Sequence, residues 1–238
     1  MQKKAIVIGA TSGIGRELAK ILAREGYILG LVGRRMPLLE QLKQELPSEV
    51  FIRQIDVAAE TAIDQLKELI REMDGVDLGI ISSGVGFINP NLRWQRERET
   101  IAVNIAGFAA MANVLMHHFL TRGAGHLVGI SSIAGLRGDS SAPAYAASKA
   151  FISNYLQGLR KKTVKMRTGV VITEVQPGFV DTAMAQGEGL FWVAPPEKAA
   201  RQIYRAIKKR KKHVYITQRW RVIAWFMKIL PDFIYNRI

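Results

Sequence analysis

Tyr145 and Lys149 lie four residues apart in the segment SAPAYAASKA, residues 141–150. In a helix this spacing puts a phenol and an ammonium group on one face, one turn apart. Reduction of a carbonyl by hydride leaves an alkoxide that needs a proton, and a phenol with a lowered pKa can supply it. A neighbouring ammonium group favours the phenolate. Tyrosine and lysine at helical spacing are common, so the local sequence leaves two interpretations open: a catalytic acid–base pair, or a half-buried aromatic residue beside a solvated surface charge.

A glycine-rich turn stands near the start of the chain. Gly9, Gly13 and Gly15 follow the apolar run KAIVIGA, and Ile14 begins an amphipathic stretch. Glycines leave room for backbone N–H groups and a helix N-terminus to approach a pyrophosphate. The spacing G-x-x-x-G-x-G differs from the commoner G-x-G-x-x-G, and no G-K-[ST] of a nucleoside-triphosphatase loop follows. The turn therefore predicts a phosphate site for a dinucleotide.

Apolar, β-rich runs alternate with amphipathic segments along the chain. The predicted strands are residues 4–10, 27–33, 50–56, 76–84, 125–132, 170–178 and 213–217. The predicted helices are residues 14–24, 37–46, 61–72, 95–120, 143–161 and 196–209. Such alternation favours parallel strands joined by right-handed crossovers. We therefore expect an α/β, Rossmann-like, doubly wound three-layer sandwich with a mostly parallel seven-stranded sheet, binding its ligands at the carboxyl ends of the strands.

The chain shows no linker, internal repeat or second-domain boundary. Its 238 residues are enough to bury a sizeable core. We expect one dinucleotide-binding and catalytic domain over residues 1–238, with residues 217–238 as a basic, aromatic C-terminal extension.

Composition excludes several chemistries. The chain has no cysteine, which removes disulfides, thiolate nucleophiles and zinc–thiolate sites and fits a cytoplasmic protein. The residues around Ser131 lack the second glycine of a nucleophile elbow. We expect no metal site, because metal-binding spacing is absent around the four histidines, which are His117, His118, His126 and His213.

Charge is concentrated towards the C-terminus. Residues 197–238 carry +10 of the net charge of +14, so the rest is nearly balanced, and we expect no nucleic-acid binding because no recognised motif accompanies the charge. The N-terminal residues lack a signal-peptide cleavage pattern, and no run of about 18 apolar residues predicts a membrane-spanning helix.

Taken together, the glycine turn, the Tyr145–Lys149 pair and their order resemble the classical branch of the short-chain dehydrogenase/reductase family over residues 4–182. The resemblance implies hydride transfer between a nicotinamide dinucleotide and a carbonyl or secondary alcohol, with Tyr145 as general acid–base. It implies that Lys149 also holds the nicotinamide ribose and that Ser132 holds the substrate oxygen, with Ser131 as the adjacent alternative. It further implies that Asn104 holds a water of the proton relay, and that the protein is a homodimer or homotetramer.

The same resemblance implies cofactor contacts after several strands. Asp56 and Val57 match the adenine-side pair, and Val180 and Thr182 match the residues that face the carboxamide. Where the family usually has Asn-Asn-Ala-Gly, this chain has Ile81-Ser82-Ser83-Gly84, so the hydrogen bonds that steady this region are in doubt. The full set of expected cofactor contacts is Gly9, Ser12, Gly13, Ile14, Gly15, Arg34, Arg35, Asp56, Val57, Ser83, Gly84, Tyr145, Lys149, Pro177, Gly178, Val180 and Thr182.

The end of the second strand bears on the choice of nicotinamide. A site for NAD places an acid there for the ribose 2′-hydroxyl, whereas NADP needs cations. This chain has Gly33 at that position, followed by Arg34 and Arg35. A guanidinium offers two parallel hydrogen bonds to a phosphate, and Ser12 can add another. We therefore expect NADP(H) rather than NAD(H).

Residues 183–196, after Thr182, are apolar with two glycines and predict a lid over a pocket for an apolar carbonyl or alcohol.

Two other functions stay open: a 3-oxoacyl-carrier-protein reductase, and an NADP-binding sensor or scaffold with little turnover. The basic tail also has alternatives. Trp220, Ile223, Met227 and Leu230 keep helical spacing that fits core or subunit packing, while the adjoining cations also suit a membrane surface or an acidic carrier protein.

Overall fold

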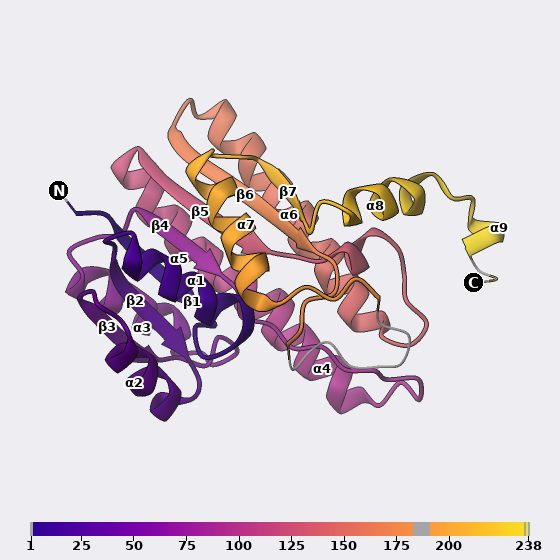
Figure 1. Ribbon diagram of the computed structural model, residues 1–238, viewed down its shortest axis with the longest axis horizontal. Coiled ribbons are helices and arrows are strands. Elements are labelled where there is room, and N and C mark those ends of the chain that lie inside the picture. Colours follow the sequence, from indigo (N-terminus) through magenta and orange to yellow (C-terminus); the bar gives the residue numbers. More distant parts are fainter. Residues whose placement is uncertain (1, 183–190, 236, 238) are drawn as a thin grey trace.

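Seven strands form one parallel sheet in the order β3-β2-β1-β4-β5-β6-β7 (Figure 1). The computed structural model describes residues 2–182, 191–235 and 237. The strands are β1 (Lys4–Ile8), β2 (Ile28–Gly33), β3 (Val50–Gln54), β4 (Leu78–Ile81), β5 (Ala124–Ile130), β6 (Gly169–Pro177) and β7 (His213–Ile216). All seven predicted strands are present, and every pair is parallel. The predicted doubly wound α/β fold is confirmed.

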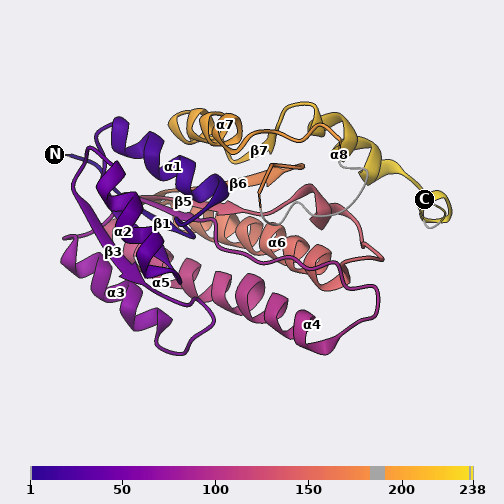
Figure 2. The same cartoon turned by 60° about the horizontal axis from the view of Figure 1, so that its bottom comes forward.

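Helices cover both faces of the sheet (Figure 2). One apolar core lies under α3 (Ala62–Glu72), α5 (Phe108–Arg122) and α6 (Pro143–Lys165). The other lies under α1 (Gly13–Arg24), α2 (Met36–Glu45) and α7 (Pro196–Lys208). Because strand side chains point alternately to opposite faces, Ile6 and Ile8 of β1 join the first core and Ala5 and Val7 join the second.

The predicted helix over residues 95–120 is interrupted. The structure has α4 (Trp94–Ile101), a π-helical turn from Ala102 to Gly107, and then α5. A side chain at Gly107 would lie 2.7 Å from Cγ2 of Val57, so glycine allows the turn to approach the end of β3 closely. Single π-turns inside α-helices often occur at functional sites, and this one carries Asn104.

The stretch Trp94–Arg122 is long and apolar enough to cross a membrane by length and composition alone, which our reading of the sequence did not anticipate. Its most apolar window is 56% buried inside the protein. Its apolar side chains, among them Phe108, Met111, Leu115 and Phe119, pack in the core against the sheet. This burial is typical of the core helix of a globular fold.

The C-terminal segment continues past β7 at the carboxyl edge of the sheet. It forms α8 (Trp220–Ile229) and α9 (Asp232–Tyr235), which extend beyond the sheet at the end of the molecule away from the N-terminus (Figures 1 and 2). Trp220 and Ala224 are buried against the body of the protein. The predicted helical spacing is therefore found, and α8 is attached through one of its faces.

Candidate active site

A cavity of about 1140 Å³ opens at the carboxyl ends of the central strands. Most residues predicted to hold cofactor or substrate line it, namely Gly9, Ser12, Gly13, Ile14, Arg34, Arg35, Asp56, Val57, Ser83, Gly84, Ser132, Tyr145, Lys149, Pro177, Gly178, Val180 and Thr182. Two predicted residues, Gly15 and Asn104, do not line it. The residues gather because each follows a strand, or begins the helix after one, at the same edge of the parallel sheet.

The glycine turn packs too closely for side chains. Gly9 has a φ of +89°, and a side chain there would lie 2.5 Å from the backbone nitrogen of Ser83. A side chain at Gly15 would overlap the carbonyl oxygen of Gly9, so Gly15 shapes the turn from behind the cavity wall. No side chain among the described residues caps the N-terminus of α1. Its first N–H groups therefore remain available to an anion at Gly13 and Ile14.

Arg35 is attached to the same turn. Its Nη2 donates hydrogen bonds to Oγ1 of Thr11 at 2.8 Å and to Oγ of Ser12 at 3.1 Å. The adjacent Arg34 is held by its backbone, where its carbonyl oxygen accepts a hydrogen bond from Nε2 of Gln54 at 2.9 Å. Both guanidinium groups are exposed at one end of the cavity, which gives that end a positive charge.

The position of Gly33 is crowded. A side chain there would lie 2.8 Å from Cγ2 of Thr11. An acidic residue at the end of β2 would therefore collide with the threonine that Arg35 binds. A side chain at residue 33 would require Thr11 to shift, which disfavours an acid here.

Tyr145 and Lys149 lie on the first turns of α6, with the Lys149 Nζ 5.5 Å from the centroid of the tyrosine ring. The Lys149 Nζ also donates a hydrogen bond to the carbonyl oxygen of Ile130, at the end of β5, at 3.3 Å. Lys149 is only 3% exposed, and burial lowers its pKa to about 8. A buried ammonium with one hydrogen-bond acceptor among the described residues has donors left for another ligand.

The pKa of Tyr145 lies above its ordinary value, because burial disfavours the phenolate, and the neighbouring Ser132 side chain opposes this effect. We expected Lys149 to lower this pKa. In the structure, burial acts on both groups towards their neutral forms. The phenol is thus held in its protonated form.

The two adjacent serines have different partners. The Ser131 hydroxyl donates to the Glu174 carboxylate at 3.2 Å or to the Val175 carbonyl at 3.1 Å, so it is directed towards β6. The Ser132 hydroxyl accepts a hydrogen bond from the N–H of Ala134 at 3.1 Å, donates a long one to the Pro177 carbonyl at 3.4 Å, and lies beside Tyr145. Of the two, Ser132 has the geometry to meet a substrate oxygen next to the phenol.

Asn104 is fully buried behind Lys149 and Gly84. Its Nδ2 donates hydrogen bonds to the Val85 carbonyl at 2.8 Å and to the Ser148 hydroxyl at 3.0 Å. Its Oδ1 accepts a hydrogen bond from the N–H of Val85 at 2.9 Å. The side chain therefore holds the segment after β4, where the usual asparagines are missing.

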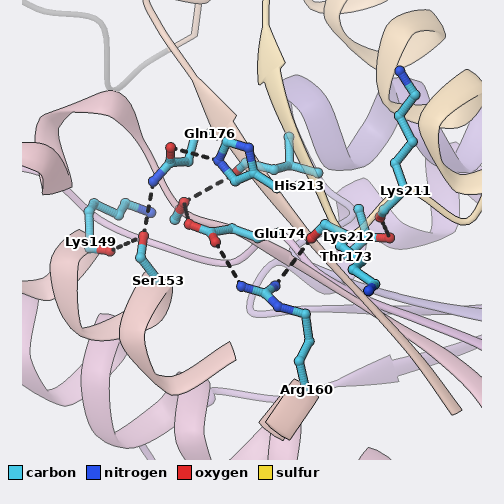
Figure 3. A network of polar contacts seen from close by, with 11 residues as sticks. Lys149, Ser153, Arg160, Thr173, Glu174, Gln176, Lys211, Lys212 and His213 are labelled. Carbon is cyan, nitrogen blue, oxygen red and sulfur yellow. Dashed lines mark hydrogen bonds and ion pairs between the residues drawn. The ribbon is translucent and has the colours of Figure 1, made fainter. Parts of the chain in front are cut away.

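A polar network fixes α6 to the neighbouring strands (Figure 3). Gln176 of β6 donates to the Ser153 hydroxyl at 3.1 Å, and its amide oxygen lies 2.8 Å from the His213 ring on β7. Arg160, near the other end of α6, pairs with the buried Glu174 carboxylate at 3.4 Å. The helix that carries Tyr145 and Lys149 is thereby held in register with the sheet.

The other end of the cavity is apolar and aromatic, and sequence reasoning missed most of it. The ring of Trp220 lies 5.3 Å from that of Phe179 and 5.1 Å from that of Phe191. The indole nitrogen of Trp220 is buried and has no hydrogen-bond partner among the described residues. The apolar lining includes Val85, Phe87, Ile88, Ile133, Phe179, Phe191, Trp220, Ile223 and Met227.

The helical spacing of Trp220, Ile223 and Met227 was visible in the sequence, but nothing local shows which surface such a stripe covers.

Of the predicted lid over residues 183–196, residues 183–190 lie outside the described residues. Phe191 is the first described residue of this segment and lines the cavity. Among the described residues, no group of three histidine or acidic side chains could hold a metal ion.

The model of the short chain dehydrogenase family matches residues 3–190 of this chain. The protein therefore belongs to the short-chain dehydrogenase family, as the fold and the arrangement of the site indicate. It is similar to an uncharacterized oxidoreductase of Myxococcus xanthus, with 39% identity over 76% of this chain and 74% of the relative. An uncharacterized oxidoreductase of Staphylococcus epidermidis is 32% identical over 78% of this chain and 81% of its own length.

Solved structures share the fold at lower identity. A short-chain dehydrogenase from Sphingobium yanoikuyae in complex with NADPH superposes with a TM-score of 0.80 and 22% identity, covering 97% of both chains. A short-chain dehydrogenase/reductase from Burkholderia phymatum in complex with NAD gives a TM-score of 0.85 and 21% identity, covering 94% of this chain and 92% of that one. The neighbours thus bind either nicotinamide.

Proposed function

We propose that the protein is an NADP(H)-dependent oxidoreductase that transfers hydride between the nicotinamide and an apolar carbonyl or secondary alcohol, with Tyr145 as general acid–base. The observation that carries the proposal is the arrangement within a single cavity. The glycine turn and two arginines lie at one end, an apolar wall lies at the other, and Ser132, Tyr145 and Lys149 line it with them.

The residues present fit a dinucleotide. The uncapped N-terminus of α1 suits a pyrophosphate, and close packing at Gly9 keeps side chains out of its way. The Ser83 hydroxyl is buried on the cavity wall without a partner among the described residues, as expected of a group that a ligand satisfies. When bound there, the cofactor supplies or accepts the hydride.

The preference for NADP(H) is supported by Arg34, Arg35 and Gly33. The hydrogen bonds from Arg35 to Thr11 and Ser12 keep a guanidinium beside the turn, where a 2′-phosphate can form charge-assisted hydrogen bonds. Gly33 provides no carboxylate for the ribose 2′-hydroxyl of NAD, and the close approach of Thr11 disfavours an acidic side chain at this position.

In the reducing direction, the Ser132 hydroxyl orients the substrate oxygen and Tyr145 donates its phenolic proton to that oxygen. Burial keeps the phenol protonated beforehand. Lys149, with a pKa of about 8, is mostly protonated at neutral pH and can return a proton towards Tyr145 afterwards. Asn104 acts behind the lysine by holding the segment at Val85 in place.

The test is NADPH oxidation by the purified protein against ketones, aldehydes and acyl thioesters, beside the Tyr145→Phe variant. We expect turnover on an apolar ketone or aldehyde, its loss in the variant, and unchanged NADPH binding in both. Preference for the thioesters would favour the carrier-protein reductase. Binding of NADPH without turnover on any member of the panel would favour the sensor, and full activity of Tyr145→Phe would remove the role given to the phenol.

A further inference from the structure

Helix α8 has two apolar faces. Its inner face carries Trp220, Ile223, Ala224 and Met227, which are buried or line the cavity. Its outer face, which we call the outer stripe, carries Val222, Trp225, Phe226 and Ile229, which are 55%, 58%, 53% and 56% exposed. Each set follows the spacing i, i+3, i+4, i+7 of one helix face. A surface helix needs only the inner face to attach to its protein, so the outer stripe is unexplained by the fold.

Cations border the outer stripe. Arg221 and Lys228 are seven residues apart, so they share one edge of the helix between its two apolar faces. Asp232 is the only acidic residue between 217 and 238. Its carboxylate is paired with Arg137 at 2.5 Å. The exposed surface of α8 is therefore both apolar and positively charged.

The helix is fastened to the body of the protein. Arg137 donates hydrogen bonds to the carbonyl oxygens of Met227, at 2.8 Å, and of Leu230, at the C-terminal end of α8. The Tyr235 hydroxyl donates to the carbonyl oxygen of Gly138 at 2.6 Å. These contacts fix the inner face against the cavity and leave the outer stripe, together with the 68% exposed Phe233 of α9, directed outward.

We propose that the outer stripe of α8, with Phe233, binds the surface of an anionic lipid bilayer. Tryptophan and phenylalanine beside arginine and lysine suit the boundary between headgroups and acyl chains. A cationic segment next to an anionic leaflet gains electrostatic energy. The same face of a second copy would meet like charge, because residues 217–238 carry four arginine or lysine side chains and one acidic side chain.

The size of the patch also favours a bilayer over a second copy. The outer stripe and Phe233 amount to five side chains. A stable protein–protein interface uses roughly 20–30 residues on each side. Insertion of a few aromatic side chains into lipid needs no such extended complementary surface.

This inference rests in one part on the proposed function: binding would place the cavity mouth at the lipid surface. Ile88 and Phe191 line the cavity and are also 41% and 47% exposed, so its mouth is apolar. The inner and outer faces of α8 are separated by a single helix diameter of about 10 Å. The substrate class that fits is therefore a carbonyl or alcohol dissolved in the bilayer.

The test is co-sedimentation of the full chain with vesicles of phosphatidylcholine, with and without phosphatidylglycerol, at low and high salt. We expect binding to the anionic vesicles and weaker binding at high salt. The double variant Trp225→Gln with Phe226→Gln should bind at least about tenfold more weakly, because two exposed aromatic groups no longer enter the lipid.

The matched control is Val164→Gln with Met166→Gln. These side chains are 72% and 50% exposed. They lie at the end of α6, next to the amino end of β6, whereas the cavity lies at the carboxyl ends of the strands. The control should bind vesicles like the unmodified protein, and both double variants should bind NADPH normally because neither pair lines the cavity. Equal vesicle binding by both double variants would overturn the inference.

Sedimentation equilibrium without lipid tests whether the outer stripe instead contacts a second copy of the chain. If the Trp225 and Phe226 variant dissociates an oligomer while vesicle binding is unchanged, the stripe is a subunit interface and the inference is wrong. Vesicle binding requires no turnover, so its failure is distinguishable from failure of the proposed reaction. An apolar ketone dissolved in anionic vesicles should be reduced at least about tenfold more slowly by this variant, with equal rates on a water-soluble ketone.

Discussion

The side chain of Asn104 pairs with the backbone of Val85 through two hydrogen bonds, one in each direction. Oδ1 accepts from the N–H at 2.9 Å, and Nδ2 donates to the carbonyl at 2.8 Å. This is the pattern by which one peptide group satisfies another. The π-helical turn thereby secures the segment after β4, next to Gly84 and Lys149.

Asn104→Ala should lower the free energy of unfolding by about 1–3 kcal/mol, because it leaves the half-buried N–H and carbonyl of Val85 without their side-chain partner. Turnover should fall further than stability alone explains, since Gly84 and Lys149 lie beside this pair. Urea unfolding and steady-state kinetics measure the two effects. Asn113→Ala, at an exposed position of α5, is the control and should change the unfolding free energy by less than about 0.5 kcal/mol. Equal stability of the two variants would contradict the role of Asn104.

Lys149→Met should stabilise the protein while abolishing turnover. Burial lowers the pKa of Lys149 from 10.5 to about 8, so the folded protein carries a buried charge at neutral pH. Removing that charge should raise the free energy of unfolding by on the order of 3 kcal/mol. Chemical denaturation at pH 7 measures it, and Lys161→Met, at an exposed position of the same helix, is the control. A destabilised Lys149→Met protein would show that the ammonium is better compensated than its burial implies.

The pH dependence of this difference has a definite sign. Below pH 8 the lysine is protonated in the folded and the unfolded states, and the advantage of Lys149→Met is largest. Between about 8 and 10.5 the unfolded state binds the extra proton, so the stability of the unmodified protein rises with pH. The two unfolding free energies should therefore converge as the pH rises through this range. A constant difference from pH 7 to 10 would contradict the lowered pKa.

Arg35→Ala should weaken NADPH binding about tenfold to a hundredfold and leave NADH binding nearly unchanged, because only the 2′-phosphate needs the guanidinium. Fluorescence titration of each nucleotide measures the dissociation constants. Arg24→Ala, at an exposed position at the end of α1, removes the same charge away from the turn and should change neither. Equal weakening for both nucleotides would assign Arg35 to the stability of the turn.

Gly33→Asp alone should not tighten NADH binding, because its side chain would lie 2.8 Å from Cγ2 of Thr11. Adding Thr11→Ser removes that methyl group and keeps the hydroxyl that Arg35 binds. The pair Gly33→Asp and Thr11→Ser should therefore bind NADH more tightly than Gly33→Asp does. Identical NADH dissociation constants for the single and double variants would show that the clash is relieved in another way.

The sequence predicts the seven strands, most helix bounds and the gathering of the site, because each depends on local pattern. Burial on both faces leaves continuous apolar runs in β1 and β4, and residues after parallel strands must meet at one edge. The break at residues 102–107 is different. It depends on Gly107 packing against Val57 and on Asn104 reaching Val85, which are contacts across the fold that helical periodicity does not contain.

The environment of each side chain was the second feature that the sequence did not predict. The raised pKa of Tyr145 comes from burial, whereas the sequence shows only that a lysine is one turn away. Ser131 and Ser132 are distinguished by contacts that the sequence does not show, with the Glu174 carboxylate of β6 beside Ser131 and Tyr145 of α6 beside Ser132. The homo-oligomer, the cytoplasmic location and contact with a carrier protein depend on other molecules and stay predictions.

Gly178→Ala should displace Trp220 from the cavity wall. A side chain at residue 178 would overlap the indole ring, which lies against this glycine. Overpacking of this kind costs about 1–3 kcal/mol, and it should separate Trp220 from the ring of Phe179, now 5.3 Å away. Thermal unfolding and the tryptophan emission maximum measure the two changes. Gly138→Ala is the control, because nothing lies within 4 Å of a side chain there. If Trp220 fixes α8 to the body of the protein, Gly178→Ala should also make the C-terminal segment more sensitive to limited proteolysis. Resistance equal to that of Gly138→Ala would mean that the contacts of Arg137 and Tyr235 are enough to hold the helix.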